Sequence, residues 1–349
     1  MKLCMAEEDL LVNEAGRPLP MPKQTPSLGL KQHKVRCMQR SPTFIAGTAD
    51  ETHNQLSVWT VNLQDDQVEP HTANPALMHS IPHRGDVLDI DLHDYNQSPT
   101  VFTASGEGRV QCYSVESQAT CDFVLCEAWS VATASPALGV AYGSEKGCLA
   151  AVSEDGSLIQ LDASLGKQLS KTEKRGSSLL GVHWHSPHQV ATVGSCVLLW
   201  DFRLNTGPVA QFEAISERDV ALNCAATNPH KRNILSAGSS KGEIFFWDTR
   251  FVPHTNLTQG QPNSLSRQKI VPHTADIWGV QFYKSGYGDL FSCSSDGNLL
   301  ASHIDDADAF PRPVVTFDLP VNSFDISDAF GALVAASDSE VLTVVDLRA

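Results

Sequence analysis

Short apolar segments alternate with polar, glycine-bearing turns along most of the chain. In GSSKGEIFFWDTR at 238–250, Gly238 and Gly242 flank a polar tip, and the apolar segment that follows ends in Trp247 and Asp248. A segment rich in small residues, a turn and a second apolar segment are typical of a β-hairpin. The pattern therefore predicts buried strands.

This hairpin pattern occurs seven times in the chain. The seven segments are 44–60, 101–114, 149–162, 189–201, 234–248, 290–303 and 332–346. The residues that match Trp247 in the other units are Trp59, Tyr113, Leu161, Trp200, Ser302 and Val344. The steps between successive matching positions are close to the roughly 40 to 45 residues of a four-stranded propeller blade. We therefore predict an all-β chain that forms a seven-bladed β-propeller.

The last unit determines how the ring closes. It ends at Asp346 with three residues remaining, so we expect its outer strand to come from the N-terminal side. We assign this strand to 28–34, where it would protect an exposed sheet edge. Four prolines between positions 18 and 26 predict a flexible or extended arm over 1–27. The propeller domain is then expected over 28–349.

Composition and charge narrow the class of partner. The net charge of −15 argues against nucleic acid, because binding to phosphates depends on lysine and arginine. No apolar run approaches the roughly 18 to 20 residues of a membrane span, and no secretory signal is evident. The nine cysteines lack C-x-x-C spacing and are expected to be free core residues in a reducing compartment. Protein surfaces are therefore the expected partners.

No polar cluster has the spacing of a catalytic or metal site. His183 and His185 share one face of a predicted strand and His188 follows a turn, but these positions also fit an innermost strand and its exit turn. The spacing of the cysteines at 112, 121 and 126 fits no standard zinc pattern. A G-x-S-x-G elbow, a P-loop and a dinucleotide fingerprint are absent from the sequence. We predict that the protein is no enzyme and needs no metal, cofactor or small-molecule substrate.

Two tryptophans are candidate partner-binding residues. Trp278 lies between Ile277 and Val280, which we expect to face the core, so its indole would lie on the rim of the ring. Trp129, in CEAWSVA, is a second candidate. The alternative for both is that the indole fills space between blades.

The repeat resembles the WD40 family through the dipeptides Trp200-Asp201 and Trp247-Asp248, and the resemblance covers about residue 28 to the C-terminus. The structural positions that it implies are Trp59, Tyr113, Trp200, Asp201, Trp247 and Asp248. Blades of this family often join a histidine, a serine or threonine, an aspartate and the tryptophan in a hydrogen-bonded tetrad.

No unit keeps this whole tetrad. The fifth unit has its tryptophan and Ser236 but Lys241 at the aspartate position, and the sixth has His273 and Asp296 but Ser302 at the tryptophan position. We therefore expect the blades to depend more on packing.

Two resemblances within the family imply different functions. The boxes Trp200-Asp201-Phe202-Arg203 and Trp247-Asp248-Thr249-Arg250 resemble those of WD40 substrate receptors of cullin-4 ubiquitin ligases. A stronger resemblance is to the small seven-bladed WD40 nucleoporins of the nuclear pore Y-complex, whose likeness runs in order through all seven units. It includes AGTADETHNQLSVW, HRGDVLDIDLHD, VSEDGSL, VLLWDFR, DVALNCAATNPHKRNILSAG, HTADIWGVQF and VNSFDI. The arm before residue 28 is longer than usual in that family, and 304–320 is shorter.

The nucleoporin resemblance implies a non-enzymatic scaffold subunit of the Y-complex that docks on α-solenoid nucleoporins. It implies roles in pore assembly, in nucleocytoplasmic transport of protein and mRNA, and at the kinetochore in mitosis. The expected location is the nucleus, at the nuclear pore complex of the nuclear envelope. The cullin-4 receptor remains the alternative.

Overall fold

The computed structural model describes most of the chain. The described residues are 23–25, 28–49, 52–61, 75–93, 99–117, 123–143, 147–172, 177–204, 207–215, 219–250, 264–265, 268–283, 289–304 and 310–347. Among them, every regular element is a β-strand, so the prediction of an all-β chain is confirmed.

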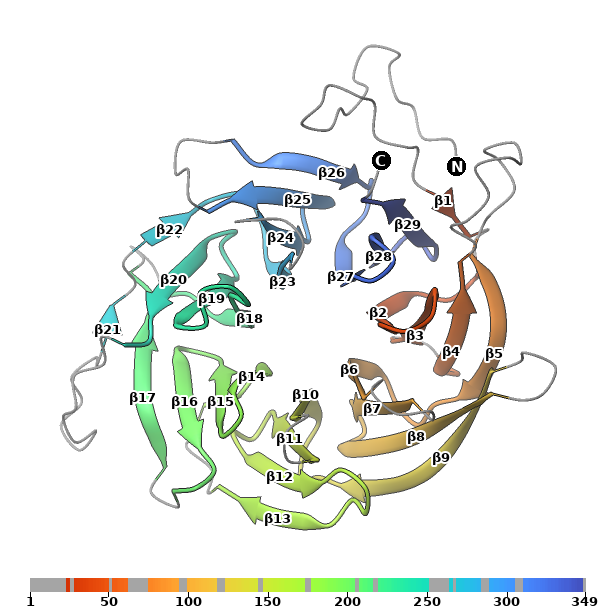
Figure 1. Cartoon of the computed structure of the whole chain (residues 1–349), viewed down its shortest axis with the longest axis horizontal. Coiled ribbons are helices and arrows are strands. Elements are labelled where there is room, and N and C mark those ends of the chain that lie inside the picture. The colour runs from red at the N-terminus through yellow and green to blue at the C-terminus, as the bar shows by residue number, and fades with distance from the viewer. Residues whose placement is uncertain are drawn as a thin grey trace.

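The strands form seven sheets in a ring around a central channel (Figure 1). The first sheet contains β2 (Gln32–Cys37), β3 (Thr43–Thr48), β4 (Gln55–Thr60) and β5 (Ala76–Pro82). The second contains β6 (Val87–His93), β7 (Thr100–Ser105), β8 (Arg109–Ser117) and β9 (Phe123–Ala132). The third contains β10 (Ala137–Gly143), β11 (Cys148–Ser153), β12 (Leu158–Asp162) and β13 (Gln168–Lys171).

The other four sheets repeat this order from the channel outward. The fourth contains β14 (Gly181–Ser186), β15 (Gln189–Val193), β16 (Val197–Asp201) and β17 (Pro208–Glu213). The fifth contains β18 (Leu222–Thr227), β19 (Ile234–Ser239), β20 (Ile244–Asp248) and β22 (Gln268–Ile270). The sixth contains β23 (Ile277–Phe282), β24 (Asp289–Ser294), β25 (Asn298–His303) and β26 (Arg312–Thr316). The seventh contains β27 (Val321–Ser327), β28 (Ala332–Ser337), β29 (Leu342–Asp346) and β1 (Lys23–Gln24). The predicted seven-bladed propeller is therefore confirmed.

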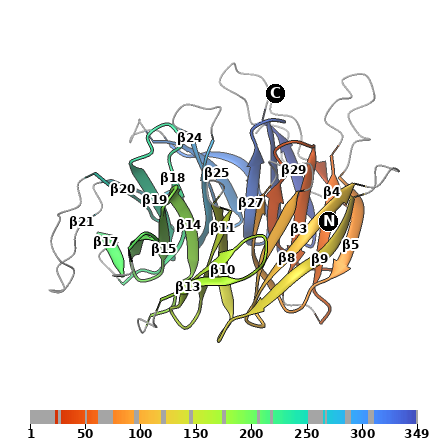
Figure 2. The same ribbon diagram turned by 60° about the horizontal axis from the view of Figure 1, so that its bottom comes forward.

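The strands run through the thickness of the ring, so the turns lie on two opposite faces (Figure 2). We call top face the one that carries the turns between the second and third strands of each blade and the links into the next innermost strand. The turns between first and second and between third and fourth strands lie on the bottom face. Gly242 occupies a top-face turn at φ 76°, where a Cβ atom would collide with the carbonyl of His273.

The second strand of a blade is the most buried because blades cover both of its faces. Every residue of β3, β11 and β28 is buried, and these strands read TFIAGT, CLAAVS and ALVAAS. The abundance of alanine and other small side chains lets neighbouring blades approach closely. Seven apolar clusters result, one at each junction between consecutive blades.

We call WD position the place in each blade that corresponds to Trp247 in the fifth. The residues at this position face the preceding blade. Trp247 is fully buried against the fourth blade, and Tyr113 packs against the first. The seventh blade requires a correction of one residue. Val345 lies opposite Leu333, in the register that Trp247 has with its own partner strand, whereas Val344 points to the first blade. The sequence alignment had no tryptophan there to fix the register.

An N-terminal strand closes the ring as predicted, but the segment assigned to it was wrong. Lys23–Gln24 pairs with β29, and the N–H of Thr25 donates to the carbonyl of Leu342 at 3.0 Å. The 28–34 segment instead leads into β2, the innermost strand of the first blade. The chain must cross the width of a sheet between an outer and an innermost strand, so the closing strand has to lie further upstream. Residues 1–22, where most of the expected arm falls, lie outside the described residues.

The fourth blade has a fifth strand that the sequence pattern did not predict. Ser264–Leu265 forms β21, which pairs in parallel with Phe212–Glu213 of β17. These residues come from the long connection between β20 and β22, so part of the fifth unit covers the outer edge of the fourth blade.

Candidate protein-interaction surface

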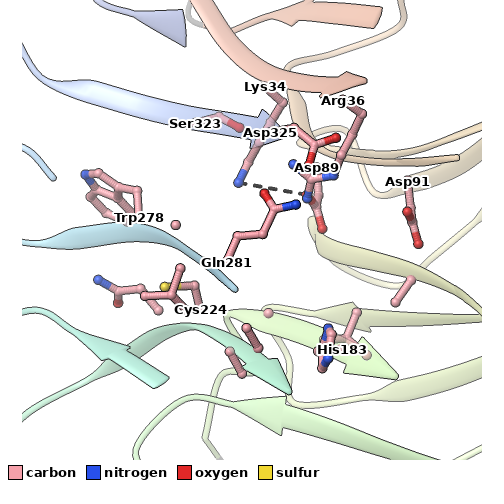
Figure 3. Close-up of a pocket in the computed structure, with 18 of the residues that line it drawn as sticks. Lys34, Arg36, Asp89, Asp91, His183, Cys224, Trp278, Gln281, Ser323 and Asp325 are labelled. Atoms are coloured by element: carbon pink, nitrogen blue, oxygen red, sulfur yellow. Dashed lines mark hydrogen bonds and ion pairs between the residues drawn. The ribbon is translucent and has the colours of Figure 1, made fainter. Parts of the chain in front are cut away.

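Trp278 lies on the top face because β23 begins with a β-bulge. Ile277 and Gly279 pair with consecutive residues of β24, so Trp278 is the extra residue between them. Its side chain is 41% exposed, whereas Ile277 is fully buried and Val280 is 9% exposed. The predicted inward positions are thus confirmed, and Trp278 lines a cavity in the channel (Figure 3).

A hydrogen bond holds the exposed indole in place. Trp278 Nε1 donates to Ser295 Oγ at 2.7 Å, and the N–H of Ser295 donates to the carbonyl of Asp276 at 2.9 Å. Both contacts involve the turn between β24 and β25. An aromatic side chain that is already ordered loses little conformational entropy when a partner covers it.

The same turn is braced by the partial tetrad of the sixth blade. His273 Nδ1 lies 3.0 Å from Asp296 Oδ2, and its Nε2 lies 2.8 Å from Ser292 Oγ. Burial lowers the pKa of His273, so the ring is neutral at pH 7 and its Nδ1 carries the proton shared with the carboxylate. Burial acts to raise the pKa of Asp296, but the N–H groups of Thr274 and Asn298 outweigh it and the pKa is lowered. The turn beside Trp278 is therefore rigid and carries a negative charge.

Below the indole, the channel contains a cavity of about 330 Å³. Its two sides differ in chemistry (Figure 3). Charged side chains from the seventh, first and second blades line one side, namely Asp325, Lys34, Arg36, Asp89 and Asp91. The opposite side, from the third to the sixth blade, is lined largely by small or apolar residues such as Val140, Gly181, Ala226 and Gly279.

The channel carboxylates connect the innermost strands of consecutive blades. Asp89 Oδ2 accepts a hydrogen bond from the N–H of Val140 at 3.1 Å. Its other carboxylate oxygen lies 3.3 Å from Arg36 Nη2 and 3.8 Å from Lys34 Nζ. Asp91 accepts from the N–H of Tyr142 at 2.6 Å. Neighbouring innermost strands do not pair with one another, so these bonds satisfy backbone groups that face the channel. The polar groups of this wall therefore act mainly in holding the ring together.

Burial dominates the titration of two of these carboxylates. It raises the pKa of Asp91 to about 6, although the N–H of Tyr142 and the charge of Arg36 oppose the shift. The pKa of Asp325 is also raised by burial, against the effect of Arg36 and of the N–H of Cys37. The channel wall therefore carries less negative charge below pH 6 than at pH 7.

The histidine cluster of the fourth blade binds the fifth blade. His183 Nε2 accepts from the N–H of Thr227 at 3.1 Å, and His185 Nδ1 lies 3.0 Å from the hydroxyl of the same residue. Burial and the neighbouring His185 lower the pKa of His183 to about 4, so it is neutral at pH 7. Among the described residues, no group of three or more histidine, cysteine, aspartate or glutamate side chains has a metal-binding arrangement. Cys121 lies outside the described residues.

Trp129 occupies the junction between the second and third blades. Its Nε1 donates to the carbonyl of Ala163 at 3.1 Å, and its ring lies against the Cα of Gly166 and 6.1 Å from the ring of Phe102. The side chain is half-buried. This arrangement favours the packing alternative over partner contact for Trp129.

The arginines of the two W-D-x-R boxes bind their own aspartates. Arg203 Nε donates to Asp201 at 2.9 Å, and Arg250 Nε donates to Asp248 at 3.0 Å. These bonds hold the pKa of both carboxyls below the ordinary value. Both guanidinium groups are exposed on the bottom face, opposite Trp278.

Comparisons with known proteins identify relatives that span most of the ring. Human nucleoporin Nup43 is 28% identical over 280 residues, which are 75% of this chain and 69% of the human protein. Mouse nucleoporin Nup43 is 25% identical over the same shares of the two chains. The chain is a seven-bladed β-propeller similar to the nucleoporin Nup43.

Other comparisons are shorter. The nuclear pore complex protein nup43 of Dictyostelium discoideum is 27% identical over 177 residues, or 44% of this chain and 39% of that protein. No family model matches the chain. In the described part of the chain, no helix has the length and apolar character that would let it cross a membrane. The resemblance to WD40 nucleoporins seen in the sequence is thus confirmed by the Nup43 relatives.

The charged wall of the channel was not predicted from the sequence. Its signal was present in HRGDVLDIDLHD, where Asp89 and Asp91 alternate with the buried Ile90. The alternation places both aspartates on one side of an innermost strand. Lys34 was missed because 28–34 was assigned to an outer strand, and Arg36 lies two residues beyond that segment.

Proposed function

We propose that the chain is a non-catalytic scaffold subunit of the nuclear pore complex and binds other nucleoporins. The observation that carries the proposal is the likeness to Nup43, which extends over three quarters of the chain and so over most of the blades. A likeness confined to the WD dipeptides would fit any propeller of the family. Likeness through most of the ring supports a shared role instead.

A more specific proposal follows from the resemblance of the sequence to the WD40 nucleoporins of the Y-complex. The chain is a subunit of the Y-complex, contacts α-solenoid nucleoporins, and acts in pore assembly and nucleocytoplasmic transport, with a further role at the kinetochore. Its location is the nuclear envelope, at the pore. We assign the contact to the top face, where Trp278 presents an exposed and ordered indole.

The chemistry of the channel is consistent with a role without catalysis. The acidic groups Asp89, Asp91 and Asp325 bind backbone N–H groups of the next blade, and His183 does the same. A general acid or base needs a proton that it can exchange with a substrate. Groups that hold the blades together are poorly suited to that exchange.

A second candidate, the cullin-4 substrate receptor, is favoured by one observation. Arg203 and Arg250 are exposed on the same face, in adjacent blades. Each arginine already binds its own aspartate, which fixes the turn that follows the third strand. We therefore assign the pairs a local structural role.

Affinity purification followed by quantitative mass spectrometry tests the proposal. Wild-type chain should recover Y-complex nucleoporins at near-equal stoichiometry. A variant with Arg203→Ala and Arg250→Ala should recover them equally well. Recovery of the cullin-4 adaptor in place of nucleoporins, lost in the double variant, would decide for the ligase receptor.

A further inference from the structure

Three segments that contact the turn at 294–297 in the sixth blade each carry an exposed apolar residue. Trp278 binds this turn directly, Val271 precedes His273, whose ring binds the turn, and the carbonyl of Leu319 faces it from the link to the seventh blade. Val271 is 61% exposed and Leu319 is 44% exposed. We call Trp278, Val271 and Leu319 the Trp278 surface.

Carboxylates accompany these apolar residues in the same segments. Asp276 is half-exposed two residues before Trp278, and Asp318 is exposed immediately before Leu319. Neither forms an ion pair with another described residue. Asp296, whose pKa is lowered, adds a third negative charge between them.

Most lysines in this region form ion pairs with carboxylates. Lys31 lies 3.2 Å from Asp338 in the seventh blade, and Lys269 lies 2.8 Å from Glu243 in the fifth. Lys241 is exposed on the tip of the fifth blade and offsets only part of the negative charge. The two cations of the channel wall below, Lys34 and Arg36, are likewise accompanied by three carboxylates. An approaching cation is therefore attracted to this part of the top face.

We propose that the Trp278 surface binds a basic protein segment, which places a lysine or arginine side chain over the indole and neighbouring apolar side chains on Val271 and Leu319. This proposal rests on the proposed function and specifies the chemistry of the partner. The face of the indole attracts the cation. Asp276 precedes Trp278 in the sequence and Asp318 follows it, and both aspartates lie in links on the top face. A nucleic acid is excluded as occupant by the negative charge of the surface.

The affinity between the purified full chain and the nucleoporin assembly that co-purifies with it tests this chemistry. Trp278→Ala should weaken binding about tenfold or more, because it removes both the apolar contact and the cation–π contact. Trp278→Phe should retain more affinity than Trp278→Leu, since only phenylalanine keeps an aromatic face. The combined change of Asp276→Asn and Asp318→Asn should weaken binding several-fold and reduce its salt dependence.

A matched control separates local attraction from the overall charge. Glu154 is exposed on the top-face turn of the third blade, and Glu154→Gln should leave the affinity and its salt dependence unchanged. Melting temperatures measured on every variant show whether the ring is intact. If Trp278→Ala lowers the melting temperature, two other measurements test the binding chemistry. They are the comparison of Trp278→Phe with Trp278→Leu and the affinity of the variant with both Asp276→Asn and Asp318→Asn.

Two results would overturn the inference alone. One is nucleoporin binding that is indifferent to the aspartate pair, and the other is equal affinity of Trp278→Phe and Trp278→Leu. A wild-type purification that contains no nucleoporin would overturn the proposed function, and the inference with it.

Discussion

Asp325 in β27 accepts a hydrogen bond from the backbone N–H of Cys37 in β2 at 2.7 Å, which joins the last blade to the first beside the channel. At the outer edge, Lys23–Gln24 pairs with β29 in the same blade. The ring is thus closed at its inner and outer radius by residues that are far apart in sequence. Closure by the chain's own N-terminal residues removes a sheet edge that would otherwise be exposed.

The closing strand predicts a sharp difference between two truncations. Deletion of residues 1–20 should leave the melting temperature nearly unchanged, because β1 is retained. Deletion of residues 1–27 should lower it by several degrees, since β29 loses its partner and the buried Thr25 is removed. Equal melting temperatures of the two proteins in differential scanning calorimetry would refute closure by Lys23–Gln24.

Glu340 predicts a stabilising substitution. It has φ 62° in the top-face turn of the seventh blade, where Gly242 and Gly297 occupy the corresponding turns of the fifth and sixth. A side chain in this left-handed region costs about 1 to 2 kcal/mol, part of which glycine loses again through the entropy of the unfolded chain. Glu340→Gly should therefore raise the free energy of unfolding by about 0.5 to 1 kcal/mol. The reverse change, Gly297→Ala, should lower it, and urea denaturation measures both.

The hydroxyl of Ser302 predicts a second stabilising substitution. Ser302 is buried at the WD position of the sixth blade, and its Oγ has no hydrogen-bond partner among the described residues. An unsatisfied buried hydroxyl costs about 1 to 3 kcal/mol. Ser302→Ala should raise the free energy of unfolding by about 1 kcal/mol, whereas Ser292→Ala, which removes the partner of His273, should lower it. Destabilisation by Ser302→Ala would show that the hydroxyl is satisfied.

Asp91 predicts a pH dependence opposite to that of most carboxylates. Its folded-state pKa of about 6 lies above the ordinary value near 4, so between these values the folded chain holds a proton that the unfolded chain has released. The contribution of Asp91 to stability is therefore present below pH 4 and is lost as the pH rises through 6. In Asp91→Asn, this fall of unfolding free energy between pH 4 and 6 should be smaller than in wild type. Parallel pH profiles of the two proteins would contradict the raised pKa.

The sequence predicted the repeat well because the hairpins repeat their alternation of small, apolar and turn residues. Register was predictable where a large side chain marks it, as at Trp200 and Trp247, and it slipped by one at Val345, where two valines are adjacent. The closing strand was assigned to the wrong segment and β21 was missed, because two-residue strands are held by pairing across the fold and have no periodicity of their own.

The candidate surface was predicted only in part. The position of Trp278 between Ile277 and Val280 indicated exposure, and the bulge in β23 explains it. The acidic and apolar residues around it come from separate links and meet only in the folded ring. Trp129 has a similar local sequence setting, yet its indole lies between blades, because Gly166 of the third blade leaves room for it.

The central claim, that the chain is a subunit of the nuclear pore, is tested most directly by where it resides. Fluorescence imaging of the chain, tagged at its own locus, measures the share of signal at the nuclear envelope. A pore subunit should give a punctate rim that coincides with pore markers in interphase. A signal spread evenly through the nucleus or cytoplasm, with no rim, would contradict it.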